Sequence, residues 1–257
     1  MHADPALIRS AKAHVSPEEW AMRTDLAAAY RAVAMYGWDD LVFTHISARV
    51  PGPDHHFLIN PYGMMFEEIT ASSLVKVDLA GEKAMDSPFE INPAGFTIHS
   101  AVHEARADAM CVIHLHTMEG VAVSCQKAGL RPISQQSLFP LSNLAYHDYE
   151  GVALDPGEKA RLVRDLGDRH NMILRNHGLL TCGESVADAF LYMYILQKAC
   201  EVQVRAQAGG GELIDIPAPI VEGIQKAAKV VLRQAGGNIA WPGILRKLDR
   251  LDPGWRS

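Results

Sequence analysis

Strand-like and helix-like patterns alternate along the whole length of the chain. After Ser16 and Pro17, which suit the cap and the first position of a helix, apolar side chains recur with helical spacing up to Gly37. Residues 41–50 then alternate between apolar and polar side chains, as a half-buried strand does. Further segments of both kinds follow without an internal repeat or a linker. The alternation predicts one α/β domain of two or three layers and leaves the direction of neighbouring strands open.

The middle of the chain carries most of the informative side chains. Residues 93–108 are expected to form a helix that begins at Pro93, and residues 109–117 a compact apolar strand. Residues 171–183 are expected to form two strands around a sharp turn, and residues 184–210 the longest helix.

Length and charge exclude several classes of protein. The chain has 257 residues, enough to bury a sizeable core, and its net charge of −6 gives no global attraction to nucleic acid or to an anionic membrane. The longest apolar runs fall short of the roughly 18 residues that suggest a membrane span, and the N-terminus lacks the apolar core of a signal peptide. The four cysteines show no CxxC spacing, and three lie in apolar segments, which predicts reduced thiols in the cytoplasm.

The motif His114-Leu115-His116 follows the apolar run 109–113. Side chains two residues apart on a strand project from the same face, so both imidazoles are expected to point the same way. Two neutral imidazoles on a rigid strand form half of a metal site. The alternative is a pair of inert, hydrogen-bonded histidines at the end of a strand.

A third imidazole is available in Asn176-His177-Gly178, directly after an apolar strand. Three protein ligands with one open position are the arrangement of a catalytic zinc site. In the alternative interpretation His177 only caps a turn.

Three more histidines could contribute to the same site. His99 and His103 lie one helical turn apart and are either groups that orient the metal ligands or a polar stripe on a packed helix. His45 lies in a polar break between apolar residues and either lines the pocket or is a hydrogen-bonded loop histidine.

The cluster 146–149 combines aromatic and polar side chains. Tyr146 is a candidate proton donor, and Asp148 a candidate to orient His147, although such clusters are also common at exposed strand edges. Nucleotide-binding, serine-hydrolase and HExxH metalloprotease motifs are absent from the sequence.

The HxH motif, the downstream Asn-His-Gly and the order of the segments between them resemble the class II aldolase/adducin family. The stretches THISARV, FLINPYGMMFEEITASSLVKVDLAG, GFTIHSAVHEARADAMCVIHLHT and AYHDYEG are similar to the adducin head domain and its bacterial relatives. The resemblance covers about residues 22–210 and makes residues 1–257 a single domain with a loose N-terminal arm and C-terminal tail. It implies a three-layer α/β/α sandwich with a central, largely antiparallel sheet.

The resemblance also implies a divalent metal ion held by His114, His116 and His177, with zinc expected before manganese, iron or cobalt. It further implies a homo-oligomer, a tetramer, that acts on a small molecule and binds neither nucleic acid nor membrane. The aldolases of this family cleave ketose phosphates, and a glutamate moves the proton.

The sequence departs from the aldolase pattern at two places. A Pro-Ser-Ser-Glu-like segment of the aldolases corresponds to residues 92–95, where Gly95 stands in place of the glutamate, and their Gly-Asn pair corresponds to Thr44-His45. The hydroxyl groups that hold phosphate are therefore missing, which predicts that the ligand is not a sugar phosphate. A Gly95→Glu substitution is expected to restore a carboxylate at the metal.

Three functions remain in competition. The first is a metal-dependent carbon–carbon lyase, either a decarboxylase or a retro-aldolase, for a small non-phosphorylated hydroxy- or oxo-acid. His45, Tyr146 or a water molecule would supply its proton. The second is a non-catalytic, adducin-like binding or assembly module. The third is a mononuclear iron oxygenase on the same fold.

Overall fold

Seven strands form a single sheet in the computed structural model, which describes residues 4–151 and 156–257. The strands are β1 (His45–Arg49), β2 (Phe57–Ile59), β3 (Val75–Val77), β4 (Cys111–Leu115), β5 (Leu144–His147), β6 (Asn171–Leu174) and β7 (Gly178–Gly183). Their spatial order is β3-β2-β1-β4-β7-β6-β5, and within the described residues only β5 and β6 run parallel. The largely antiparallel sheet implied by the resemblance is confirmed.

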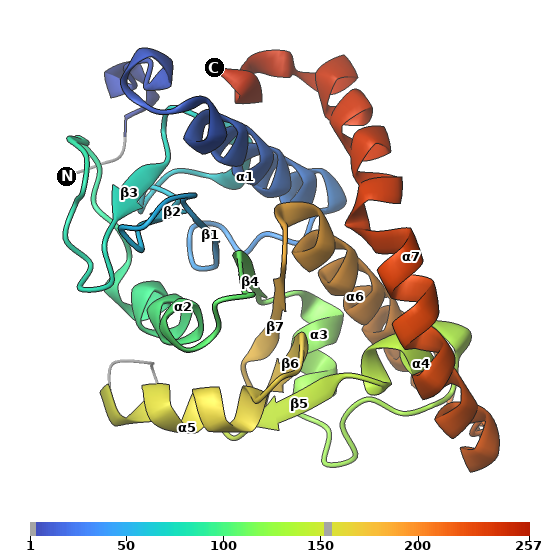
Figure 1. The fold of residues 1–257 in the computed structure, drawn as a ribbon. Helices are drawn as coiled ribbons and strands as arrows, with labels where there is room; N and C mark the ends of the chain where they lie inside the picture. The colour runs from blue at the N-terminus through green and yellow to red at the C-terminus, as the bar shows by residue number, and fades with distance from the viewer. Residues whose placement is uncertain (1–3, 152–155) are drawn as a thin grey trace.

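Helices cover both faces of this sheet (Figure 1). The helices are α1 (Pro17–Tyr36), α2 (Pro93–Ala105), α3 (Met118–Ser124), α4 (Gln135–Leu141), α5 (Pro156–Leu166), α6 (Val186–Ala208) and α7 (Ala218–Leu251). Helices α1 and α6 pack on one face, with α7 against both of them, while α2 and α5 pack on the other face. The three-layer α/β/α sandwich is therefore confirmed.

Helix α1 begins and ends where its capping residues predict. The Ser16 hydroxyl accepts the backbone N–H of Glu19 at 3.1 Å, which satisfies a donor of the first helical turn. Gly37 adopts a left-handed φ of 67° and donates its N–H to Ala34, so the helix stops there.

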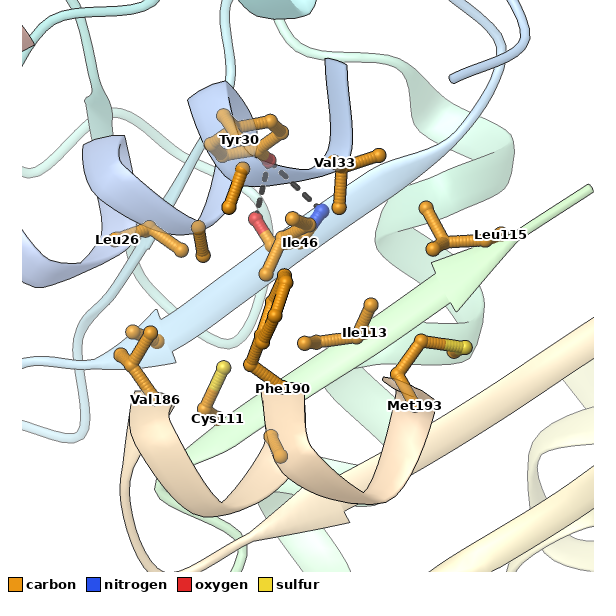
Figure 2. Packing of buried hydrophobic residues seen from close by; sticks show 14 of the residues in the cluster. Leu26, Tyr30, Val33, Ile46, Cys111, Ile113, Leu115, Val186, Phe190 and Met193 are labelled. Atoms are coloured by element: carbon orange, nitrogen blue, oxygen red, sulfur yellow. Dashed lines mark hydrogen bonds between the residues drawn. The ribbon is translucent and has the colours of Figure 1, made fainter. Parts of the chain in front are cut away.

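Strand β4 is buried on both faces, and its buried neighbours show towards which layer of helices the side chain of His114 points. Ile113 and the residues at 111 and 115 pack into the core between the sheet and α1 and α6, beside Phe190 (Figure 2). Val112 belongs to the second apolar cluster, which the sheet forms with α2 and α5. Since successive side chains of a strand alternate, His114 lies on the same face as Val112 and points to the α2 layer.

A buried tyrosine fastens β1 to α1. The Tyr30 hydroxyl accepts the backbone N–H of Ile46 at 2.8 Å and also contacts the carbonyl oxygen of that residue (Figure 2). It lies 2.9 Å from Oδ1 of Asn60, in the residue that follows β2. Helix α1 therefore fixes the position of the strand that carries His45.

Two expectations about segment boundaries need correction. Strand β1 begins at His45 rather than at residue 41, because Phe43 donates its N–H to Asp40 and closes a turn. The C-terminal tail is not loose, since α7 packs along α6 and the side chain of Trp255 is fully buried. The backbone carbonyl of Trp255 also accepts the N–H of Ala71.

Thiol burial agrees with the apolar segments in which three cysteines lie. Cys111, Cys182 and Cys200 are buried free thiols, and Cys125 is exposed.

Among the described residues, no helix has both the length and the apolar composition that crossing a membrane requires.

Candidate metal centre

The fold brings the three predicted imidazoles together. His114 lies near the end of β4, His116 follows that strand, and His177 lies in the turn between β6 and β7. One ring nitrogen from each lies within 4.8 Å of the others, and the ring centroids are 4.7–4.8 Å apart. Pairing of β4 with β7 produces this meeting, because it places the turn before β7 beside the end of β4.

Hydrogen bonds direct a lone pair of two of these rings at the same point. Nδ1 of His114 lies 3.0 Å from the carbonyl oxygen of Leu179, and Nδ1 of His116 lies 2.9 Å from Oδ2 of Asp40. Both acceptors require the proton on Nδ1, so in the neutral rings both Nε2 atoms carry bare lone pairs. Those two Nε2 atoms are only 3.1 Å apart.

Two lone pairs that face each other at this distance repel unless a cation lies between them. Ligand nitrogens on one tetrahedral zinc ion are about 3.3 Å apart, which is close to the observed separation. The donor set and its spacing therefore fit a divalent metal ion, with His177 as a third imidazole.

Burial keeps two of the three imidazoles, those of His114 and His177, in the neutral form that binds metal. His114 is only 3% exposed, and burial holds the pKa of its imidazole well below the ordinary value. Burial, and after it the neighbouring His116, lowers the pKa of His177 to about 4. Protons therefore do not compete with a metal ion for the ring nitrogens of these two residues near neutral pH.

The three imidazoles line a cavity of about 380 Å³. Its other lining residues are Asp40, Phe43, His45, Asn92, Gly95, Ile98, Tyr149, Gly151 and Asn176. Lysine and arginine are absent from the part of this lining that the structure describes. A ligand with a phosphate dianion would thus find no cationic side chain of this chain there.

His45 reaches this cavity from the first residue of β1. It pairs with His114 across the two neighbouring strands, is 3% exposed and lines the cavity. Neither of its ring nitrogens has a hydrogen-bond partner among the described residues. Burial, and after it His116, lowers the pKa of His45 to about 4, so its imidazole is neutral near pH 7.

Gly95 does not leave a vacant place for a carboxylate. A Cβ atom added there would lie 2.3 Å from Cε1 and Nδ1 of His45. The expectation that Gly95→Glu restores a carboxylate at the metal therefore stays a prediction, and the glutamate would first have to displace the imidazole of His45 from that space.

The structure does not bring Tyr146 to the cavity. Its hydroxyl accepts the N–H of Leu130 at 3.0 Å, and Arg175 stacks on its ring. The tyrosine that lines the cavity is Tyr149, whose ring centroid lies 6.3 Å from that of His177.

The partner of His147 also differs from the expected one. Its Nδ1 lies 2.8 Å from Oδ2 of Asp165 on α5, not beside Asp148. His147 thus ties β5 to α5 through a residue that lies 18 positions further along the chain.

Asp40 is the contact of the site that sequence reasoning missed. Its carboxylate contacts the imidazole of His116, which lies 76 residues away in sequence, and no local motif marks that relationship. His99 and His103, which were candidates for this orienting role, instead hydrogen-bond to Ser47 inside the α2 layer.

The family model for the class II aldolase and adducin N-terminal domain matches residues 24–204. The match covers more than half of the chain, so the protein belongs to the class II aldolase/adducin family, as the resemblance of its motifs indicates.

Relatives lie on both branches of the family. A Pseudomonas aeruginosa protein named "Putative aldolase class 2 protein PA3430" is 62% identical over 260 residues, which cover 100% of this chain and 99% of the relative. Mouse alpha-adducin is 48% identical over 193 residues, which cover 74% of this chain but only 26% of that protein.

Solved structures support the same assignment. The crystal structure of an aldolase II superfamily protein from Pseudomonas syringae is 49% identical with a TM-score of 0.93, and the match covers 97% of this chain and 100% of that one. An L-fuculose 1-phosphate aldolase from Glaciozyma antarctica is 27% identical with a TM-score of 0.77, and the match covers 98% and 99% of the two chains.

Proposed function

We propose that this protein is a metal-dependent carbon–carbon lyase that acts on a small, non-phosphorylated hydroxy- or oxo-acid. The observation that carries the proposal is the pair of inward-facing Nε2 lone pairs of His114 and His116, with His177 beside them. Three imidazoles with an open position are the donor set of catalytic zinc, so zinc is the proposed metal. When bound, it would polarise a coordinated substrate oxygen and stabilise the negative charge that develops on it.

The lining of the cavity supports an acid without phosphate. The described lining residues include no lysine or arginine, whereas apolar surface comes from Phe43, Ile98 and Tyr149. Asn92 and Asn176 offer amide groups that suit hydroxyl or carbonyl oxygens. The proposed substrate is therefore compact, oxygen-rich and held mainly through the three imidazoles and their metal.

His45 is the proposed proton carrier. It lines the cavity, and neither ring nitrogen has a partner among the described residues. In a retro-aldol cleavage, the neutral ring would accept the proton of the hydroxyl whose carbon becomes a carbonyl. The carbon–carbon bond breaks, its electron pair remains on the other fragment, and His45 returns the proton to that carbon. In a decarboxylation only the protonation of the carbon is needed, and water supplies that proton, because the imidazole of His45 is neutral near pH 7.

Metal analysis and product detection test the proposal together. Protein purified without chelator is expected to contain about one metal ion per chain, and His114→Ala less than a tenth of that amount. The exposed His14 gives the control variant His14→Ala, which is expected to keep its metal. A panel of hydroxy- and oxo-acids is then screened for release of an aldehyde or of carbon dioxide. Equal metal in His114→Ala and wild type, or no product under any metal, contradicts the proposal.

The similarity to alpha-adducin favours one competing function, a non-catalytic binding or assembly module of the adducin type. A protein that binds no metal at all after gentle purification would support that module. The proposed assembly for the enzyme is a homotetramer, which light scattering can measure in the same samples.

A further inference from the structure

One face of β1 meets one stripe of α2 directly behind the metal centre. His45 and Ser47 lie two residues apart on β1 and share its α2 face. Gly95, His99 and His103 lie at intervals of four on α2, so they share one stripe of that helix. The contacts between these two rows are all buried.

The first contact is steric. A Cβ atom at Gly95 would lie 2.3 Å from two atoms of the His45 ring and 2.5 Å from its Cγ. Ordinary contacts between non-bonded heavy atoms are about 3.5–4.0 Å. Only a residue without a side chain therefore lets α2 approach while the His45 imidazole keeps its present place.

The second contact is a hydrogen-bond chain with one allowed direction. Nδ1 of His103 lies 3.0 Å from the carbonyl oxygen of Ala109, which can only accept, so His103 carries its proton on Nδ1. Its bare Nε2 must then accept from the Ser47 hydroxyl at 2.7 Å. Having donated its single proton, the Ser47 oxygen accepts from Nδ1 of His99 at 2.6 Å.

This direction leaves His99 with a bare lone pair on Nε2. Burial lowers the pKa of His99 and of His103, which keeps both rings neutral and the chain intact. Nε2 of His99 is buried and has no hydrogen-bond partner among the described residues. Its ring lies edge-on to His45, with centroids 5.9 Å apart and an interplanar angle of 81°.

We propose that Gly95 and His99 are positioning residues of His45. Gly95 leaves the imidazole the space that a side chain of α2 would otherwise fill. Nε2 of His99 and both ring nitrogens of His45 lack partners among the residues that the structure describes, so a small turn of the His45 ring would let one of its N–H groups donate to Nε2 of His99. That hydrogen bond would assign the proton to one nitrogen of His45 and leave the lone pair of the other for the cavity. The catalytic use of His45 rests on the proposed lyase function, whereas the positioning itself does not.

The steric half is tested by a double-mutant cycle on thermal unfolding of the metal-free protein. Gly95→Ala is expected to lower the Tm of the wild-type chain by about 2–8 °C, because the added methyl displaces the ring. In a His45→Ala background the same substitution is expected to raise the Tm by about 1–3 °C, since alanine is the better helix former once the clash is gone. An equal loss in both backgrounds overturns the steric half.

The acceptor half is tested by ¹⁵N NMR of histidine-labelled protein, which reports the tautomer of each ring. His99 and His103 are expected in the Nδ1–H form and His45 in a single tautomer. His99→Phe, which keeps a ring without an acceptor, is expected to leave His45 in a mixture of tautomers. His99→Gln, which offers an oxygen acceptor near the position of Nε2, is expected to restore one tautomer. A single, unchanged tautomer of His45 in His99→Phe overturns the assignment.

If a lyase substrate is found, His99→Phe should lower kcat at least tenfold with KM changed less than threefold, and His99→Gln should recover most of the loss. If no substrate reacts, the proposed lyase function is contradicted. The unfolding and NMR tests still decide whether Gly95 and His99 position His45, because neither test depends on turnover. Wild-type kcat in His99→Phe would overturn the positioning role even in an active enzyme.

Discussion

Replacing Asp40 by asparagine tests how far the outer contact of His116 strengthens metal binding. Oδ2 of Asp40 lies 2.9 Å from Nδ1 of His116, whose Nε2 points to the proposed ion. Asparagine keeps an oxygen that can accept from Nδ1, so the substitution removes mainly the negative charge.

The contribution of the Asp40 charge to the free energy of metal binding follows from the charges and the distance between them. The carboxylate oxygen would lie about 6–7 Å from an ion bound at Nε2, given a metal–nitrogen distance of about 2 Å. Attraction between this carboxylate and a divalent ion is about 1.3 kcal/mol in water and about 5 kcal/mol at an effective dielectric constant of 20. The Asp40 side chain is 45% exposed, so solvent and salt place the value towards the lower limit, at about 1–2 kcal/mol.

The expected result is a Kd for zinc that is about tenfold weaker in Asp40→Asn, measured by competition with a chromophoric chelator. The effect should shrink as salt is added, because salt screens a half-exposed charge. The neighbouring Asp39 provides the control Asp39→Asn, since that side chain lines a separate cavity with Arg31 and Lys247. An unchanged Kd in Asp40→Asn, or an equal loss in Asp39→Asn, refutes the reasoning.

Two predictions concern stability. Tyr30→Phe leaves the buried N–H of Ile46 without its acceptor and should cost about 1–3 kcal/mol, seen as a lower urea midpoint with an unchanged m-value; an unaltered midpoint contradicts this. The metal-free protein should lose stability as pH falls from about 6.5 to about 4, because the unfolded chain protonates His45 and His177 in that window while the folded chain does not. The buried His45 alone should account for on the order of 3 kcal/mol, and a flat denaturation profile across this window argues against neutral, buried rings.

Local patterns in the sequence predicted the parts of the site that depend on a single element. The HxH spacing places two imidazoles on one face of a strand wherever that strand lies. The caps of α1 at Ser16 and Gly37 are likewise local, because the groups they satisfy are the ends of that helix alone. The order of the motif blocks also indicated the family, and with it the three-layer sandwich.

Contacts between distant segments had no such local signal. Asp40 and His116 meet across 76 residues, and Tyr149 lines the cavity although the sequence pointed to Tyr146 as the candidate proton donor. The sequence shows that position 95 is a glycine and so lacks the side chain of the aldolase glutamate. Only the packing of α2 on β1 reveals that His45 fills its place.

The sequence by itself determined which strand faces are apolar, where a helix starts and stops, and which side chains can bind a metal, because each of these properties depends only on a few neighbouring residues. The tertiary structure alone decided that β7 lies beside β4, so that His177 joins His114 and His116, and that α2 lies close enough to β1 for Gly95 to touch His45. Such contacts between distant residues depend on how whole strands pair and helices pack. A short stretch of sequence does not encode the distance between two other segments of the chain.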